Sequence, residues 1–225
     1  MARAVPSRVL APREGASSLA EQAYHTIRDL IVTLELPPGA PVREPELVIS
    51  LGIGRTPIRE ALRRLAQERL VEVFPRRGIF VTTVDLRDLA RLCEVRAVLE
   101  PEAARLAAER ATQTDLDDLQ ELLAVLELRR RREDRWLIEL DQRIHRTIYR
   151  ASHNSFLAET LEKYYAHALR IWMLALARTD LGAAVHQHGE LLDAILRGRG
   201  DRAAALMRAH VEAFEEAMRD VLLET

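Results

Sequence analysis

Apolar residues recur at helical spacing along most of this chain, and one segment near its start departs from that pattern. A capping box between Ser18 and Glu21 opens a first helix, which ends before Pro37. Residues 43–81 then predict a short helix, a glycine turn, a second helix and a β-hairpin. From residue 85 onward the spacing is helical throughout.

The second of these short helices carries the clearest pattern. We expect Thr56 to be its N-cap and Pro57 its first residue, and apolar residues at i, i+3, i+4 and i+7 from Ile58 predict one buried face. Two β-branched runs follow, at 70–74 and 79–83, separated by a turn with glycine. Helix, turn, helix and hairpin in this order predict a winged helix-turn-helix that docks on DNA.

The remaining chain predicts a bundle of helices in two layers, in which small molecules commonly bind between helices. Pro101 is expected to kink or divide the first helix, and Thr114 to cap the second. The expected helices span 86–111, 115–132, 134–151, 155–178, 181–198 and 201–223.

The fold class is therefore mainly α, with a small β-hairpin wing in the first domain and an all-α second domain. We expect a flexible tail over residues 1–16, a winged helix-turn-helix domain over 17–83, and an all-helical domain for ligand binding and dimerisation over 84–225. No apolar run approaches the length of a membrane span, and the single Cys93 suits a reducing cytosol, so we expect a cytoplasmic protein.

The formal net charge of -2 does not by itself indicate a protein that binds nucleic acid. Arginines nevertheless gather on the second helix and the hairpin. Arg59 and Arg63 lie one turn apart on another face of this helix than its apolar residues, and Arg55 lies just ahead of its cap. Arg76 and Arg77 lie at the hairpin tip. Such arginines can contact guanine or clamp phosphate. The alternative is a solvated helix face that pairs with nearby glutamates.

Four segments carry a resemblance to a known family: LPPG at 36–39, GRTPIREAL at 54–62, LV at 70–71 and RRG at 76–78. With these motifs the chain resembles the GntR family of bacterial transcription regulators, in the subfamily with an all-helical FCD ligand domain. The resemblance implies DNA contacts by Arg55, Thr56, Arg59 and Gly78. The family usually carries another contacting arginine where this chain has Pro45, and Arg43 is its expected substitute.

Four polar residues are expected on inward helix faces of the second domain. Asp141 and His145, four residues apart, share one apolar stripe, while His188 and His210 have apolar neighbours at helical spacing. They are either four separately hydrogen-bonded core residues or the ligands of one divalent metal ion. The resemblance supports the metal, because the FCD subfamily has the same order of ligands. Three imidazoles and a carboxylate suit Zn, Ni, Mn, Co or Fe without choosing between them.

Arg96 and Glu100 lie one helical turn apart in the first bundle helix. They form either an ordinary ion pair or part of an effector pocket in which Arg96 grips a carboxylate. Tyr149 and Asn154 are further candidates for the pocket. The resemblance implies that the effector is a small organic acid.

Two classes of function remain open at this point. The first is a transcription regulator that binds a near-palindromic DNA operator as a homodimer, with operator affinity modulated by the effector. The second is a helical-bundle metalloenzyme that acts on a small organic acid. The enzyme is disfavoured because the sequence lacks the Glu-x-x-His pairs of di-metal bundles, and no His-Glu-x-x-His occurs.

Overall fold

The computed structural model describes residues 18–127, 134–175 and 185–223. Contacts divide the chain between Val84 and Asp85 into two compact units, each with its own core. In the described residues, no helix is long and apolar enough to cross a membrane.

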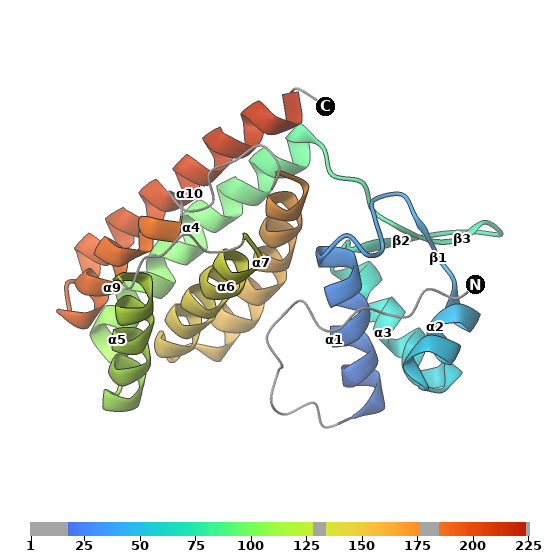
Figure 1. Cartoon of the computed structure of the whole chain (residues 1–225), viewed down its shortest axis with the longest axis horizontal. Helices are drawn as coiled ribbons and strands as arrows, with labels where there is room; N and C mark the ends of the chain where they lie inside the picture. Colours follow the sequence, from blue (N-terminus) through green and yellow to red (C-terminus); the bar gives the residue numbers. More distant parts are fainter. Residues whose placement is uncertain (1–17, 128–133, 176–184, 224–225) are drawn as a thin grey trace. The chain divides into compact units, whose positions relative to one another are not determined.

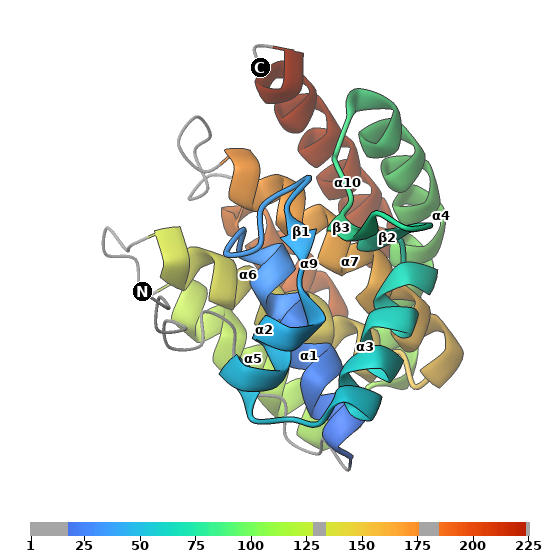
Figure 2. The same ribbon diagram turned by 90° about the vertical axis from the view of Figure 1, so that its right-hand side faces the viewer.

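The first unit packs helices against a small sheet (Figure 1). The sheet is antiparallel with strand order β1-β3-β2, and Val73 of β2 pairs with Ile79 of β3. Figure 2 shows β2 and β3 joined as the hairpin. The elements are α1 (Leu19–Val32), β1 (Pro41–Val42), α2 (Glu44–Leu51), α3 (Arg55–Gln67), β2 (Val71–Phe74) and β3 (Gly78–Val81).

The apolar face predicted for the second helix is confirmed in α3, where Ile58 and Leu65 are fully buried. The capping box is also confirmed at its first half, since the Ser18 hydroxyl accepts from the Glu21 N–H at 3.2 Å. The predicted N-cap of α3 is wrong. Gly54 holds that place in an extended conformation, and Thr56 is already helical.

The shift of the α3 start by two residues has a simple cause. Pro57 still falls in the first turn, where backbone N–H groups have no partner within the helix, so the proline permits the earlier start. The hairpin turn needs residues with positive φ, and it has Gly78 at +104° and Arg76 at +63°.

The second unit contains only helices in its described residues. In Figures 1 and 2, α4 and α10 run side by side along its length. The described helices are α4 (Leu86–Arg110), α5 (Gln113–Glu127), α6 (Asp134–Ala151), α7 (Ser155–Ala175), α9 (His188–Leu196) and α10 (Gly200–Leu223).

Two boundary predictions in this unit are wrong. For the first helix, Pro101 was expected to kink or divide it, and the structure excludes the division, because α4 continues through Pro101 as one helix. The helix predicted over 181–198 is described from residue 185, and a turn at Gln187 precedes α9. Gly189 is a weak helix former, and Gly198 ends the segment with a φ of +66°. The predicted ends of the second and fourth helices, 128–132 and 176–178, lie outside the described residues.

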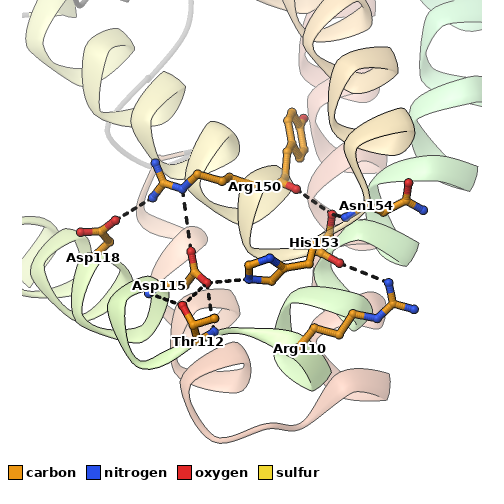
Figure 3. Close-up of polar contacts among 9 residues, drawn as sticks. Arg110, Thr112, Asp115, Asp118, Arg150, His153 and Asn154 are labelled. Atoms are coloured by element: carbon orange, nitrogen blue, oxygen red, sulfur yellow. Dashed lines mark hydrogen bonds and ion pairs between the residues drawn. The ribbon is translucent and has the colours of Figure 1, made fainter. Parts of the chain in front are cut away.

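The second wrong boundary is the cap of α5, which is Thr112 rather than Thr114. The N–H of Asp115 donates to the Thr112 hydroxyl at 3.3 Å, and the N–H of Thr112 donates back to the Asp115 carboxylate at 2.9 Å. The carboxylate also contacts Nε2 of His153, from the turn between α6 and α7, at 2.8 Å (Figure 3). One buried carboxylate therefore ties the start of α5 to that turn.

We expect Asp115→Asn to lower the free energy of unfolding by about 1 kcal/mol at neutral pH, because charge-assisted bonds become neutral ones. Burial alone would raise the pKa of Asp115, but hydrogen bonds from Thr112 and His153 outweigh burial and lower the pKa below 3.8. The stabilisation by the Asp115 charge is therefore complete above the pKa that Asp115 has in the unfolded chain. It is lost as the pH falls through the lower pKa that Asp115 has in the folded protein.

Urea unfolding at neutral and acidic pH measures this difference. The gap between wild type and Asp115→Asn should close on acidification. Asp117→Asn, at an exposed position of the same helix, is the matched control and should stay within about 0.5 kcal/mol of wild type. A gap that is constant with pH would contradict the role of the Asp115 charge.

Candidate metal centre and nucleic-acid interface

Three helices of the second unit bring the predicted metal ligands together. Asp141 and His145 lie one turn apart on α6, His188 is the first residue of α9, and His210 lies on α10. All four are buried, and one potential ligand atom from each lies within 4.8 Å of the others. This convergence follows from the inward faces that the helical spacing predicts.

Polar atoms of the four side chains lie close together at the centre of this cluster, and two of them lack a hydrogen-bond partner. Nε2 of His145 lies 3.2 Å from Nε2 of His188, and Oδ1 of Asp141 lies 3.7 Å from the same His188 nitrogen. Two buried atoms, Oδ1 of Asp141 and Nδ1 of His210, have no hydrogen-bond partner. Buried polar atoms left in this way are costly unless a cation completes them.

Neighbouring groups orient two of the four side chains. Tyr165 of α7 donates its hydroxyl to Oδ2 of Asp141 at 2.5 Å. Nδ1 of His188 lies 3.0 Å from the carbonyl of Val185, and since a carbonyl only accepts, this nitrogen carries the proton. The lone pair of His188 is therefore on Nε2, which points to the other three residues. Such outer contacts are typical of metal sites.

The protonation states favour cation binding. Burial lowers the pKa of His145 well below its usual value, and the neighbouring His188 and His210 lower it further. Burial also lowers the pKa of His210. Neutral imidazoles are the form that ligates metal. Burial raises the pKa of Tyr165, so its hydroxyl remains a donor to Asp141.

Three of the predicted effector residues lie beside this cluster. Arg96 and Glu100 of α4 are fully buried, and Nε of Arg96 donates to Oε1 of Glu100 at 2.5 Å. The guanidinium lies 4.7 Å from the ring centre of Phe214. Oε2 of Glu100 lies 3.6 Å from Nδ1 of His145, and the Tyr149 hydroxyl lies 3.1 Å from that nitrogen. Arg96 and Glu100 therefore form the expected i,i+4 ion pair, and they do so next to the four clustered residues.

The fourth predicted effector residue, Asn154, is placed elsewhere. Its Oδ1 accepts from the N–H of Leu157 at 3.2 Å and so caps α7. Figure 3 shows it at the α6–α7 turn, near His153. The structure thus gives Asn154 a role in the helix start rather than a place beside Arg96.

A cleft of about 860 Å³ opens between α5, α9 and α10, and His210 forms part of its wall. Apolar residues of α5 and α10, including Leu126 and Leu206, line it together with charged residues such as Arg199 and Glu190. The cleft therefore reaches one of the four clustered side chains from the surface.

The predicted DNA-contacting residues are all exposed in the first unit. Arg55, Thr56, Arg59 and Arg63 lie along α3, with Arg55 at its first position. Arg76, Arg77 and Gly78 form the tip of the hairpin, and Arg43 precedes α2. These positions agree with a helix and wing that meet DNA.

Sequence reasoning missed three groups at these sites. Tyr165 and the Val185 carbonyl orient Asp141 and His188 of the four-residue cluster. Glu44 holds Arg59 through a bond of 2.8 Å between Oε2 of Glu44 and Nε of Arg59. Glu44 and Arg59 are 15 residues apart, so no helical spacing connects them. The only feature of the sequence that could have indicated Glu44 is that the first turn of α2 is acidic.

Comparison with known proteins assigns the chain to a family. Residues 19–81 match the model for bacterial regulatory proteins of the gntR family, and residues 91–213 match the FCD domain. The chain is 37% identical over 196 residues to an uncharacterized HTH-type transcriptional regulator in an unstable DNA locus of Streptomyces ambofaciens, covering 84% of this chain and 80% of that protein.

Two further relatives come from Escherichia coli. The HTH-type transcriptional repressor RspR is 25% identical over 207 residues, covering 91% of this chain and 90% of that protein. The structure of McbR/YncC matches with a TM-score of 0.74 and 26% identity, over 88% of this chain and 98% of that one. These relatives are regulators rather than enzymes, and they give no support to the metalloenzyme alternative. The chain therefore belongs to the GntR family of bacterial transcription regulators, binds DNA rather than acting as an enzyme, and carries an FCD domain after its winged helix-turn-helix.

Proposed function

We propose that this regulator binds a small carboxylate effector at a metal-containing pocket in the helical unit, and that the effector changes its affinity for operator DNA. The observation that carries this proposal is the set of four buried side chains that converge from three helices, two of which have an atom without a hydrogen-bond partner. Separately hydrogen-bonded core residues would not leave Oδ1 of Asp141 and Nδ1 of His210 without partners.

One divalent ion would be held by Asp141, His145, His188 and His210. Zn, Ni, Mn, Co and Fe all suit this donor set. When bound, the ion would balance the Asp141 charge and offer remaining positions to an anion. Tyr165 and the Val185 carbonyl would keep two of the ligands in the orientation that they already have.

Arg96 is the residue that would recognise the effector carboxylate. Its Nε is occupied by Glu100, but its Nη1 is buried without a hydrogen-bond partner. A carboxylate oxygen would satisfy this donor through a charge-assisted bond. The hydroxyl of Tyr149 lies on the same side of His145, and burial raises its pKa, so it would donate to the effector as a neutral phenol.

The experiment that tests this function measures operator affinity against effector candidates. A duplex selected from a randomised library with the full chain serves as operator. The dissociation constant is then measured with small mono-, di- and tricarboxylic acids, with Zn²⁺ present or removed. At least one acid should shift operator affinity only when metal is present, and Arg96→Met should abolish the shift. A response that persists in His188→Ala without metal would contradict the proposal.

We further propose that residues 17–83 bind the operator and that residues 84–225 bind the ligand and form a homodimer. One helix-turn-helix covers only a half-site, whereas specificity over a genome needs more contacts. A near-palindromic operator follows from two-fold symmetry. Light scattering at the concentration that binds operator should give twice the mass of the chain, and a monomeric mass would contradict the dimer.

In the DNA-binding unit, Arg59→Ala should weaken operator binding by about 1–3 kcal/mol if Arg59 contacts a base. Arg55→Ala, at the start of the same helix, should also weaken operator binding. If Arg55 contacts phosphate, this loss of affinity should be similar for all DNA sequences. Affinity should also fall steeply with salt, because phosphate contacts release counterions. Gel shifts at several salt concentrations measure both effects.

The matched control for this experiment is Arg219→Ala, at an exposed position of α10 in the other unit, which should bind operator like wild type. Equal binding by wild type and the Arg55/Arg59 double alanine variant would show that another surface contacts DNA.

A further inference from the structure

An acidic side chain lies directly on one of the arginines that face DNA. Nε of Arg59, in the first half of α3, donates to Oε2 of Glu44 at 2.8 Å. The Arg59 side chain is 61% exposed and that of Glu44 is 23% exposed, so the carboxylate lies closer to the protein and the guanidinium reaches outward from it. Glu44 is the first residue of α2, and it therefore joins the two helices of the helix-turn-helix.

We propose that Glu44 is a positioning residue for DNA recognition, which holds the Arg59 guanidinium in the orientation that contacts a base. This inference rests on the proposed contact between Arg59 and the operator. It adds a residue that does not itself touch DNA and that carries the opposite charge from the residues expected at such a surface.

The geometry of the bond supports this role. Glu44 uses Nε, the nitrogen nearest the backbone, and so leaves the two terminal nitrogens of Arg59 available. Those two nitrogens form the fork that can donate to O6 and N7 of one guanine. A carboxylate bound to the terminal nitrogens would instead block the same contact.

The pairing also has an entropic consequence. A free arginine side chain samples many rotamers, and ordering it on DNA costs affinity. A side chain that is already held by Glu44 loses less freedom when it binds. Because an exposed ion pair contributes little to folding stability, removal of the Glu44 carboxylate should leave the unit folded.

Charge is the second consequence. Glu44 balances the positive charge of Arg59 and so weakens its attraction to any phosphate, whatever the DNA sequence. The base contact does not depend on that net attraction. Glu44 should therefore lower non-specific affinity while it supports specific affinity, and specificity is the difference between the two.

A second pair in the same region provides a matched comparison. Arg43 and Glu46 lie 3.4 Å apart, and their side chains are 66% and 70% exposed. Glu46 lies in the same first turn of α2 as Glu44, so its removal changes the charge equally at almost the same place. It does not contact Arg59, and it separates the effect of charge from the effect of position.

The experiment uses the full chain and two duplexes. One is the operator selected from a randomised library, and the other has the G·C pair that depends on Arg59 exchanged for another pair. The ratio of the two dissociation constants measures discrimination at that base. A uniform change of charge alters both constants together, whereas a lost orientation of Arg59 alters the ratio.

Glu44→Ala should reduce this ratio by roughly five- to tenfold, out of the range of about five- to hundredfold that one bidentate contact supplies. Glu44→Ala should also tighten binding to scrambled DNA, because the Arg59 charge is no longer balanced. The slope of the logarithm of affinity against the logarithm of salt concentration should steepen by about one. Glu44→Gln should recover most of the ratio, because its amide oxygen can still accept from Nε, but should keep the tighter non-specific binding. Glu46→Ala should tighten binding to both duplexes and to scrambled DNA, and it should leave the ratio unchanged.

Arg59→Ala distinguishes the possible failures. If it keeps the wild-type ratio at every operator position, Arg59 does not contact a base, and the proposed DNA contact is wrong. If Arg59→Ala loses the ratio but Glu44→Ala behaves like Glu46→Ala, only the role of Glu44 is wrong. In the Arg59→Ala background, Glu44→Ala should have no further effect on the ratio, and an additional loss would overturn the coupling between them.

Discussion

Addition of Zn²⁺ to the metal-free chain should raise the midpoint of thermal unfolding of the helical unit by roughly ten degrees. An ion that binds only the folded state stabilises it by about 4 kcal/mol when its concentration is a thousand times its dissociation constant. For domains of this size, each kcal/mol shifts the midpoint by about 2–4 °C. The expected effect is large because Asp141 and His210 each have a buried atom that the ion would complete.

Elemental analysis and thermal melts together test this expectation. The protein must be purified without chelator and without a nickel column, and then loaded with Zn²⁺, Ni²⁺ or Mn²⁺. Wild type should hold close to one ion per chain. The Asp141/His188 double alanine variant should hold none and should gain no stability from the ion.

The chain offers a matched control in His186, which is exposed and lies two residues before His188. His186→Ala should load and melt like wild type. If wild type fails to load any of the three ions, or if the double variant loads equally, the four residues are ordinary buried polar groups.

Local spacing was enough to predict the core of α3 and the inward faces of the four clustered polar residues, whereas the metal ion was expected only from the family resemblance. Apolar residues at i, i+3, i+4 and i+7 define one helix face without reference to other elements. The same rule placed Asp141 and His145 on one inward stripe. The apolar neighbours of His188 and His210 likewise predicted that each of these histidines faces the interior of the bundle. Side chains that point inward from separate helices of a bundle share its core, where metal and ligand sites of such folds are built.

Local spacing could not predict the features that depend on tertiary contacts. Asp141 meets Tyr165 across 24 positions, and Arg59 meets Glu44 across 15. Helix starts were wrong for a different reason. Several residues near each start could serve as caps. Gly54 rather than Thr56 begins α3 without a side-chain cap, and the reciprocal bonds between Thr112 and Asp115 favour Thr112 over Thr114.

The second large effect concerns the buried ion pair of α4. Glu100→Ala should lower the free energy of unfolding by about 3–5 kcal/mol, because it leaves the Arg96 guanidinium buried without its counter-charge. The loss should not be read as the net value of the pair. Replacing both residues, as in Arg96→Met with Glu100→Leu, should recover much of the stability, since apolar side chains of similar volume need no partner.

Urea unfolding of the metal-free protein measures this change apart from any effect on metal binding. Glu109→Ala is the matched control, because Glu109 forms an i,i+4 pair with Arg105 on the same helix, but at an exposed position. Its effect should stay within about 0.5 kcal/mol of wild type. An equally small loss in Glu100→Ala would mean that water reaches Arg96, and would weaken the argument that Arg96 depends on Glu100 or an effector carboxylate for its counter-charge. A large loss that the double replacement recovers would show that folding stability does not require the ion pair, as expected if Arg96 serves to bind the effector.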